Sequence, residues 1–215
     1  MALPDTMHAW VIDDFGDVDA FHKRERPTPE PGPGEVVVEV AATSVNPIDY
    51  KVRSGLADVF APERPAILHG DVSGTVAAVG DDVTAFTEGD EVYGCAGGFK
   101  NCPHGALADY MPCDADLLAP APSSIPLEEA AALPLVSITA WEAIVDKATV
   151  HPDDQVLVHG ATGGVGHVGI QLAKWRGGEV ITTASSEEKL DIGRSLGADD
   201  GRSEERRVGK ECIVK

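Results

Sequence analysis

Three closely spaced glycines could hold a phosphate group in the stretch VLVHGATGGVGHVG. Gly163, Gly164 and Gly166 follow a short apolar run and open a stretch of helical composition. A dinucleotide pyrophosphate needs such a turn, because no Cβ blocks its approach and the start of a helix offers free N–H groups. The pattern predicts that Gly163, Gly164, Val165 and Gly166 bind the pyrophosphate, largely through the backbone. The alternative is a glycine turn that only packs a helix on a strand.

The residues after the next apolar run, 179–184, indicate which dinucleotide binds. Sites for NAD usually place an acidic residue there to bind the ribose 2′-hydroxyl. This chain has Ala184, Ser185 and Ser186 instead. Two hydroxyls, the start of the following helix and Lys189 would attract a 2′-phosphate, which a carboxylate would repel. We therefore expect NADPH, with Ser185, Ser186 and Lys189 around its 2′-phosphate. The serines also suit a helix cap, and the two roles are compatible.

The stretch 95–113 gathers residue types that bind metals. It contains Cys95, Cys102, His104 and Cys113, which are enough in number for a tetrahedral zinc site. Their spacings do not form the paired Cys-x-x-Cys motifs that are typical of structural zinc. We expect free thiols around a loop and no bound metal here.

The charge of the chain excludes one class of partner. The 215 residues include 36 acidic and 17 basic side chains, a net charge of −19. Phosphate backbones would repel this charge, so we expect no nucleic acid partner. The acidic residues are spread along a chain of otherwise ordinary composition, which predicts a protein of a salt-loving microbe. The alternative is an acidic enzyme of an ordinary bacterium.

The sequence also carries expectations about where the protein works. It contains no apolar run near the roughly 18 residues of a membrane span, so we expect no membrane partner. The first residues lack the basic and apolar regions of a signal peptide. Four cysteines at irregular spacing suit a reducing compartment. We expect a cytoplasmic location.

The elements that must position these groups change in type along the chain. Residues 1–125 contain many short strands separated by Gly, Pro and Asp turns, which predicts a barrel-like β domain. Residues 126–201 read as strand, glycine turn, helix, strand and helix. This βαβα order is the first half of a doubly wound, Rossmann-type parallel sheet. The predicted fold class is α/β, with the β domain first.

Several motifs occur together in a familiar order: SVNPIDYKVRSG, GDVSGTVAAVGDDVTAFTEGDEVYG, GALADYM, EEAAALPLVSITAWEAI and HGATGGVGHVGIQLAK. Over about residues 7–200 the chain resembles the medium-chain dehydrogenase/reductase superfamily. It is most similar to the NADPH:quinone oxidoreductase branch, often labelled zinc-type alcohol dehydrogenase-like. The resemblance implies a GroES-like substrate domain, a Rossmann domain and an active site between them. It also leads us to expect a homodimeric parent protein.

The chain departs from the zinc enzymes of this superfamily at their metal ligands. Asn46 stands in the place of the Cys-His motif, and Gly70 stands where the ligand histidine belongs. His69 is one residue early, and on a strand it would face the opposite side. Asp71 keeps the acidic position. A catalytic zinc needs about three protein ligands, so we expect none.

A site without zinc favours particular substrates. Hydride transfer to a simple ketone benefits from a Lewis acid on the oxygen. A quinone or an α,β-unsaturated carbonyl is already electron-poor, and needs only a hydrogen-bond donor for the developing oxyanion. The sequence therefore predicts NADPH-dependent reduction of such a compound. The alternatives are an alcohol dehydrogenase with a displaced zinc site, an enoyl or 2-alkenal reductase, and a non-catalytic fragment.

Three residues are candidates for the chemical step. The resemblance places Thr139 beside the nicotinamide, where its hydroxyl could hold cofactor or substrate. Asn46 could donate to a substrate carbonyl, or it could be only a turn residue before Pro47. Lys51 stands where relatives often carry tyrosine, and could donate to the oxyanion. The proton donor is left open between these residues, and Thr139 could also be an ordinary helix residue.

The last segment, 202–215, differs from everything before it. It holds five basic and three acidic residues and shows no strand pattern, where a third apolar strand is expected. Its first eleven residues read as the in-frame translation of a common sequencing-library adapter. We therefore predict a non-native tail on a C-terminally truncated chain with two of about six Rossmann strands. We expect no measurable reductase activity from these 215 residues.

Overall fold

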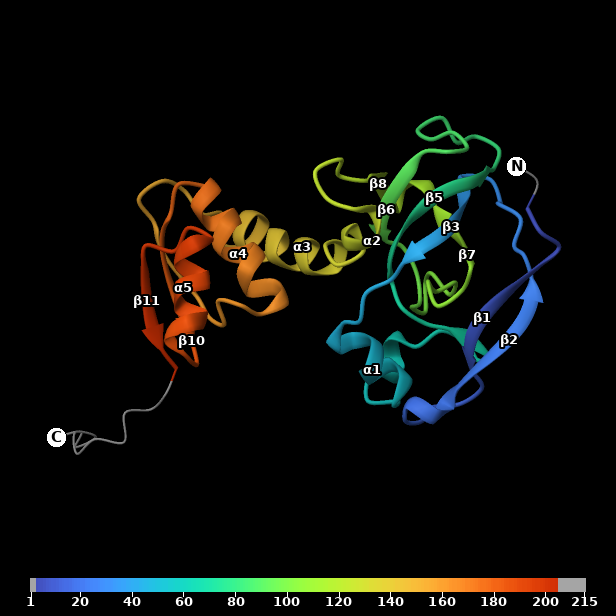
Figure 1. Cartoon of the computed structure of the whole chain (residues 1–215), viewed down its shortest axis with the longest axis horizontal. Coiled ribbons are helices and arrows are strands. Elements are labelled where there is room, and N and C mark those ends of the chain that lie inside the picture. Colours follow the sequence, from blue (N-terminus) through green and yellow to red (C-terminus); the bar gives the residue numbers. More distant parts are fainter. Residues whose placement is uncertain (1–2, 205–215) are drawn as a thin grey trace. The chain divides into compact units, whose positions relative to one another are not determined.

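The computed structural model describes residues 3–204 and divides into two compact units, Met1–Leu135 and Val136–Lys215. Figure 1 shows the strands of the first unit and the helices and parallel strands of the second. Each unit has its own core. Within residues 3–204, no helix is both long and apolar enough to cross a bilayer.

The first unit is built around a five-stranded antiparallel sheet with the order β7-β3-β5-β6-β8. Valines make its core, because Val36 and Val38 of β3 and Val72 and Val76 of β5 are almost fully buried and pack together with Met111. The strands are β3 (Glu35–Ala42), β5 (Asp71–Val79), β6 (Glu91–Cys95), β7 (Tyr110–Asp114) and β8 (Leu118–Pro120).

A second, three-stranded sheet in this unit has the order β2-β1-β4. In β1 exposed and buried residues alternate, and Met7, Ala9 and Val11 face inward. The sheet consists of β1 (Thr6–Ile12), β2 (Phe21–Pro27) and β4 (Ala66–Ile67). Short helices connect the strands: η1 (Val18–Ala20), α1 (Pro47–Arg53), η2 (Asp58–Phe60), η3 (Ala115–Leu117) and α2 (Leu127–Ala130).

The second unit contains a parallel sheet with the order β11-β10-β9. Its core joins Ile170 and Ala173 of the first crossover helix to Val180 of β10 and Leu190 of the second helix. The elements are α3 (Pro134–Trp141), the π-helical η4 (Glu142–Lys147), β9 (Gln155–Val158), α4 (Gly164–Trp175), β10 (Glu179–Ala184), α5 (Glu187–Ser195) and β11 (Asp200–Ser203). Helix α3 begins two residues before the division between the units.

The third strand corrects one prediction. Only two parallel strands were expected, but β11 pairs with β10 in register, with Ile181 opposite Asp200 and Ala184 opposite Ser203. This strand forms through backbone hydrogen bonds, and its side chains are mostly exposed. The sequence therefore shows no alternation of apolar and polar residues at this place. Two of its residues belong to the predicted tail 202–215. Residues 205–215 of that tail lie outside the described residues.

The division between the units also lies later than the predicted one at residue 125. Helix α2 packs against β3 and β5, which keeps it in the first unit. The backbone N–H of Leu135 donates to the carboxylate of Asp71 at 2.9 Å. The helical composition after residue 125 therefore begins within the first unit, and it does not coincide with the division between the two units.

Candidate functional site

The glycine turn lies between β9 and α4 in the second unit. Gly160 has a φ of 72°, and its carbonyl accepts a hydrogen bond from the N–H of Gly163 at 2.9 Å. The N–H of Ala161 donates to the carbonyl of Thr183 in β10, also at 2.9 Å. Gly163 is the N-cap residue of α4. The turn is thereby tied to the second strand before the helix begins.

The glycines of this turn have different physical roles. A Cβ on Gly166 would lie 2.0 Å from the carbonyl oxygen of Gly160, so only glycine lets the helix approach the turn. The first N–H groups of an α-helix have no partner inside the helix. Here those groups belong to Gly164, Val165 and Gly166. Because Gly163, Gly164 and Val165 are exposed, their backbone is open to a ligand, and the arrangement fits a pyrophosphate.

The three residues predicted to surround a 2′-phosphate lie together at the start of α5. Ser186 is the N-cap residue, and its side chain accepts from the N–H of Lys189. The Nζ of Lys189 is 3.1 Å from the Oγ of Ser185. All three side chains are exposed, so the ammonium and two hydroxyls can all reach an anion. Ser186 therefore has the capping role that the sequence predicted.

A buried polar cluster lies at the start of α1 in the first unit. Asp71 is only 1% exposed. Its carboxylate accepts from the Oγ of Ser44 at 2.5 Å, from the Nδ2 of Asn46 at 2.7 Å and from the N–H of Leu135. Neutral donors thus satisfy a buried carboxylate, as burial of a charge requires. Asp71 connects β5 to α1 and to the start of α3.

Asn46 is held inside this cluster. Its Nδ2 donates to Ser44 at 2.9 Å as well as to Asp71, so both amide hydrogens have acceptors. Its backbone N–H donates to the Oδ2 of Asp49 at 2.6 Å, which stabilises the start of α1. In this arrangement Asn46 orients Asp71. A contact from Asn46 to a substrate carbonyl would have to replace one of these hydrogen bonds.

Asp49 is a second buried carboxyl group in the cluster, 4% exposed. Burial raises the pKa of Asp49 to about 6, and the charge of Asp71 adds to this, while the hydrogen bond from Asn46 opposes it. An acid with such a pKa holds a proton in mildly acidic solution, where an exposed aspartate does not. Residue type and spacing alone do not mark Asp49 beyond its place in a short helix.

The space around Gly70 does not admit the histidine of the zinc enzymes. A Cβ on Gly70 would lie 2.6 Å from the Phe99 ring and 3.1 Å from the Sγ of Cys95. His69 precedes β5 and has a φ of 73°, so the expectation that it lies on a strand was wrong. Burial raises the pKa of the Cys95 thiol to about 12, which keeps it protonated at neutral pH. Within residues 3–204, no group of three or more His, Cys, Asp or Glu side chains could hold a metal ion.

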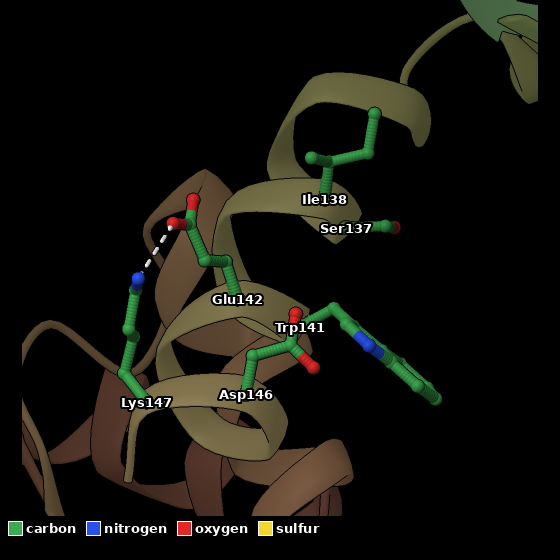
Figure 2. Close-up of a pocket in the computed structure, with 6 residues that line it drawn as sticks. All are labelled: Ser137, Ile138, Trp141, Glu142, Asp146 and Lys147. Carbon is green, nitrogen blue, oxygen red and sulfur yellow. Dashed lines mark ion pairs between the residues drawn. The ribbon is translucent and has the colours of Figure 1, made fainter.

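The other two candidates for the chemical step are exposed. Lys51 lies further along α1 than Asn46, in the first unit, and Thr139 lies on α3, in the second unit. A depression of about 490 Å³ lies on α3 and η4. Trp141, Glu142 and Lys147 line this depression, and Figure 2 shows the Trp141 side chain pointing away from the ion pair of Lys147 with Glu142, which is 3.7 Å long. Its remaining lining residues are Ser137, Ile138 and Asp146.

Two family models match the chain. The alcohol dehydrogenase GroES-like domain matches residues 32–123, and the zinc-binding dehydrogenase family matches residues 164–212. The chain belongs to the medium-chain dehydrogenase/reductase superfamily. This confirms the predicted family and fold class, a GroES-like domain followed by the start of a Rossmann sheet. The name of the second model describes a family, and it does not place zinc in this member of the superfamily.

Relatives within the superfamily include several reductases. The chain is 36% identical over 206 residues to 2-methylene-furan-3-one reductase of Solanum lycopersicum, covering 93% of this chain and 52% of that protein. It is 37% identical to a chloroplastic NADPH-dependent alkenal/one oxidoreductase of Arabidopsis thaliana, with 92% and 52% covered. The structure of a quinone oxidoreductase from Coxiella burnetii has a TM-score of 0.79, 36% identity, and 92% and 62% coverage. The chain thus spans about half the length of these two curated relatives.

Proposed function

We propose that the chain is part of an NADPH-dependent oxidoreductase that reduces a quinone or an α,β-unsaturated carbonyl without catalytic zinc. The observation that carries this proposal is the glycine turn with Ser185, Ser186 and Lys189 beside it. Because Gly166 has no side chain, the start of α4 can lie close to the carbonyl of Gly160. The exposed N–H groups at the start of α4 then bind the pyrophosphate. The names of the alkenal/one and quinone oxidoreductases support the same chemistry.

In this proposal, different residues of the chain have separate roles in binding and catalysis. NADPH supplies the hydride when it is bound. Gly163, Gly164 and Val165 hold its pyrophosphate, and Ser185 and Lys189 hold its 2′-phosphate. Thr139 orients the nicotinamide or the substrate. Lys51 donates a hydrogen bond to the oxyanion that forms as hydride adds to the electron-poor substrate.

Two measurements test the proposal. Titration of the 215-residue chain with NADPH, followed by the fluorescence of bound nicotinamide, should show saturable binding, and its absence would contradict the cofactor assignment. Consumption of NADPH is then compared for a benzoquinone, a 2-alkenal and a simple ketone. In a protein of the relatives' full length, we expect faster reduction of the first two than of the ketone. The alkenal is a second candidate substrate class because a relative carries that name.

Replacing Lys189 with alanine should weaken NADPH binding roughly tenfold, because a charge-assisted hydrogen bond to the 2′-phosphate is lost. Binding of NADH, which has no 2′-phosphate, should not change. The dissociation constants of both cofactors are measured for the chain and for the Lys189→Ala variant. Lys147→Ala is the control, since Lys147 is 74% exposed and, within residues 3–204, forms its ion pair with Glu142 on η4. An equal loss for NADPH and NADH would contradict the assignment.

The purified chain should contain no stoichiometric zinc, even after expression in zinc-supplemented medium. Gly70 stands where the ligand histidine belongs and has no side chain to bind a metal, and Asn46 stands in the place of the Cys-His motif. Elemental analysis measures the metal content, and thermal unfolding with and without a chelator measures any structural effect. One zinc ion per chain, or a fall in the unfolding temperature on chelation, would show that zinc is bound.

A further inference from the structure

His159 lies between the end of β9 and the glycine turn. Its Nδ1 is 3.1 Å from the Oγ1 of Thr183, the residue beside it on β10. The same Oγ1 accepts the backbone N–H of Gly160 at 3.3 Å and donates to the Oε1 of Glu204 at 2.6 Å. Thr183 is 8% exposed, so its hydroxyl depends on these three partners. One hydroxyl therefore connects His159, the turn and the residue after β11.

The hydrogen bonds of the Thr183 hydroxyl determine which ring nitrogen of neutral His159 carries the proton. A threonine hydroxyl has one proton to donate and two lone pairs to accept with, and a carboxylate only accepts. The 2.6 Å distance to Glu204 is typical of a charge-assisted O–H···O⁻ hydrogen bond, so the proton points to Glu204. The lone pairs then accept from Gly160 and from His159. The Nδ1 of neutral His159 must carry its proton, and its Nε2 is left as an acceptor.

The position of His159 puts this acceptor at the ligand-binding edge of the sheet. Val158 pairs with Thr182, so the carboxyl ends of the parallel strands β9 and β10 meet at one edge. Nδ1 and Nε2 are on different sides of the imidazole ring, so the contact of Nδ1 with Thr183 leaves Nε2 available, and the His159 residue is exposed. Ser185, of the predicted 2′-phosphate group, follows Thr183 by two residues.

We propose that the Nε2 of His159 accepts a hydrogen bond from a hydroxyl of the adenosine ribose of the bound dinucleotide. This proposal rests on the proposed NADPH-binding function. Phosphate oxygens only accept, so a bare Nε2 cannot bind them, and the N–H groups of the glycine turn do so instead. The adenosine ribose of a dinucleotide lies at the end of the second strand, next to Thr183. In NADPH the 2′-oxygen carries phosphate, and the 3′-hydroxyl is the donor.

The first test is the tautomer in the free protein. Long-range ¹H–¹⁵N correlation spectra of the histidine-labelled chain should show His159 protonated on Nδ1. Thr183→Val, which removes the hydroxyl, should abolish this preference, while His151, exposed at the other end of β9, should not change. Protonation of neutral His159 mainly on Nε2 would overturn the proposal. This result does not depend on whether the chain binds NADPH.

The second test replaces one ring nitrogen at a time. Glutamine places an amide near the position of Nε2, and asparagine places one near Nδ1. His159→Gln should bind NADPH within about threefold of the unsubstituted chain, and His159→Asn should bind about tenfold more weakly, the change expected for one hydrogen bond. His151→Gln and His151→Asn are the matched controls. Affinities that are unchanged in both His159 variants, or equally reduced in both, overturn the role of Nε2 while the proposed function stands. No NADPH binding by the unsubstituted chain overturns the proposed function itself.

Discussion

Replacing Gly166 with alanine should destabilise the second unit by about 3 kcal/mol. The new Cβ would lie 2.0 Å from the oxygen and 2.9 Å from the carbon of the Gly160 carbonyl. Both are backbone atoms, and the same oxygen already accepts from the N–H of Gly163. The turn cannot move aside without losing this hydrogen bond, so α4 must separate from β9. NADPH binding should be lost with the turn.

Gly169→Ala is the matched control on the same helix. A Cβ on Gly169 would lie 3.6 Å from the Cγ1 of Val158, an ordinary contact. Alanine also favours a helix interior over glycine by up to about 1 kcal/mol, so this variant should be slightly more stable. Hydrogen exchange of the β9 and β10 amides in the full chain measures both changes within the second unit. Equal protection of these amides in the two variants would contradict the assigned role of Gly166.

The parts of the site that are local in sequence could be predicted from the sequence. The turn Gly163–Gly166 and the group of Ser185, Ser186 and Lys189 each lie within a few residues, and their chemistry depends on residue type and spacing. The structure brings the second group together around the start of α5. Short-range motifs of this kind are readable because one turn and one helix start position all their members.

The buried cluster of the first unit could not be predicted in the same way. Asp71 binds Ser44, Asn46 and Leu135, which are 27, 25 and 64 residues away along the chain. A single sequence has no signal for such pairs, because each residue alone looks like an ordinary turn or helix residue. The resemblance marked Asn46 and Asp71 separately, but not their hydrogen bond. Only the structure shows that both amide hydrogens of Asn46 already have acceptors.

Strand β11 was missed for a different physical reason. Sequence patterns detect strands by the alternation of buried and exposed side chains, and Asp200–Ser203 has no buried residue. Polar contacts of the preceding residue position this strand. The carboxylate of Asp199 accepts from the Nζ of Lys174 at 2.7 Å and from the N–H of Val180 at 2.7 Å. The chain is thereby fixed beside β10 before the strand begins. Pairing of the backbone then needs no apolar residue.

The buried acid of the first unit leads to the second large expected effect, a decrease in stability as the pH rises. Asp49 has a pKa of about 6 in the folded chain, against 3.8 for an ordinary aspartate. Below about pH 4 the acid is protonated in both states and has no effect on folding. Between about pH 4 and 6 the unfolded chain releases this proton while the folded chain keeps it. The free energy of unfolding therefore falls by about 3 kcal/mol across this window, and the loss persists above it.

Asp49→Asn removes this titration and isolates its contribution. The amide oxygen of asparagine can still accept from the N–H of Asn46, so the start of α1 keeps its cap. Denaturant unfolding at several pH values measures the difference between the variant and the original chain, in which the effects of carboxyl groups that do not interact with Asp49 cancel. The variant should gain stability relative to the original chain between about pH 4 and 6, by about 3 kcal/mol in total. Asp58→Asn, at an exposed aspartate of η2, is the matched control. A constant difference for Asp49→Asn would mean that Asp49 ionises equally easily in both states, and that burial beside Asp71 costs the folded chain nothing.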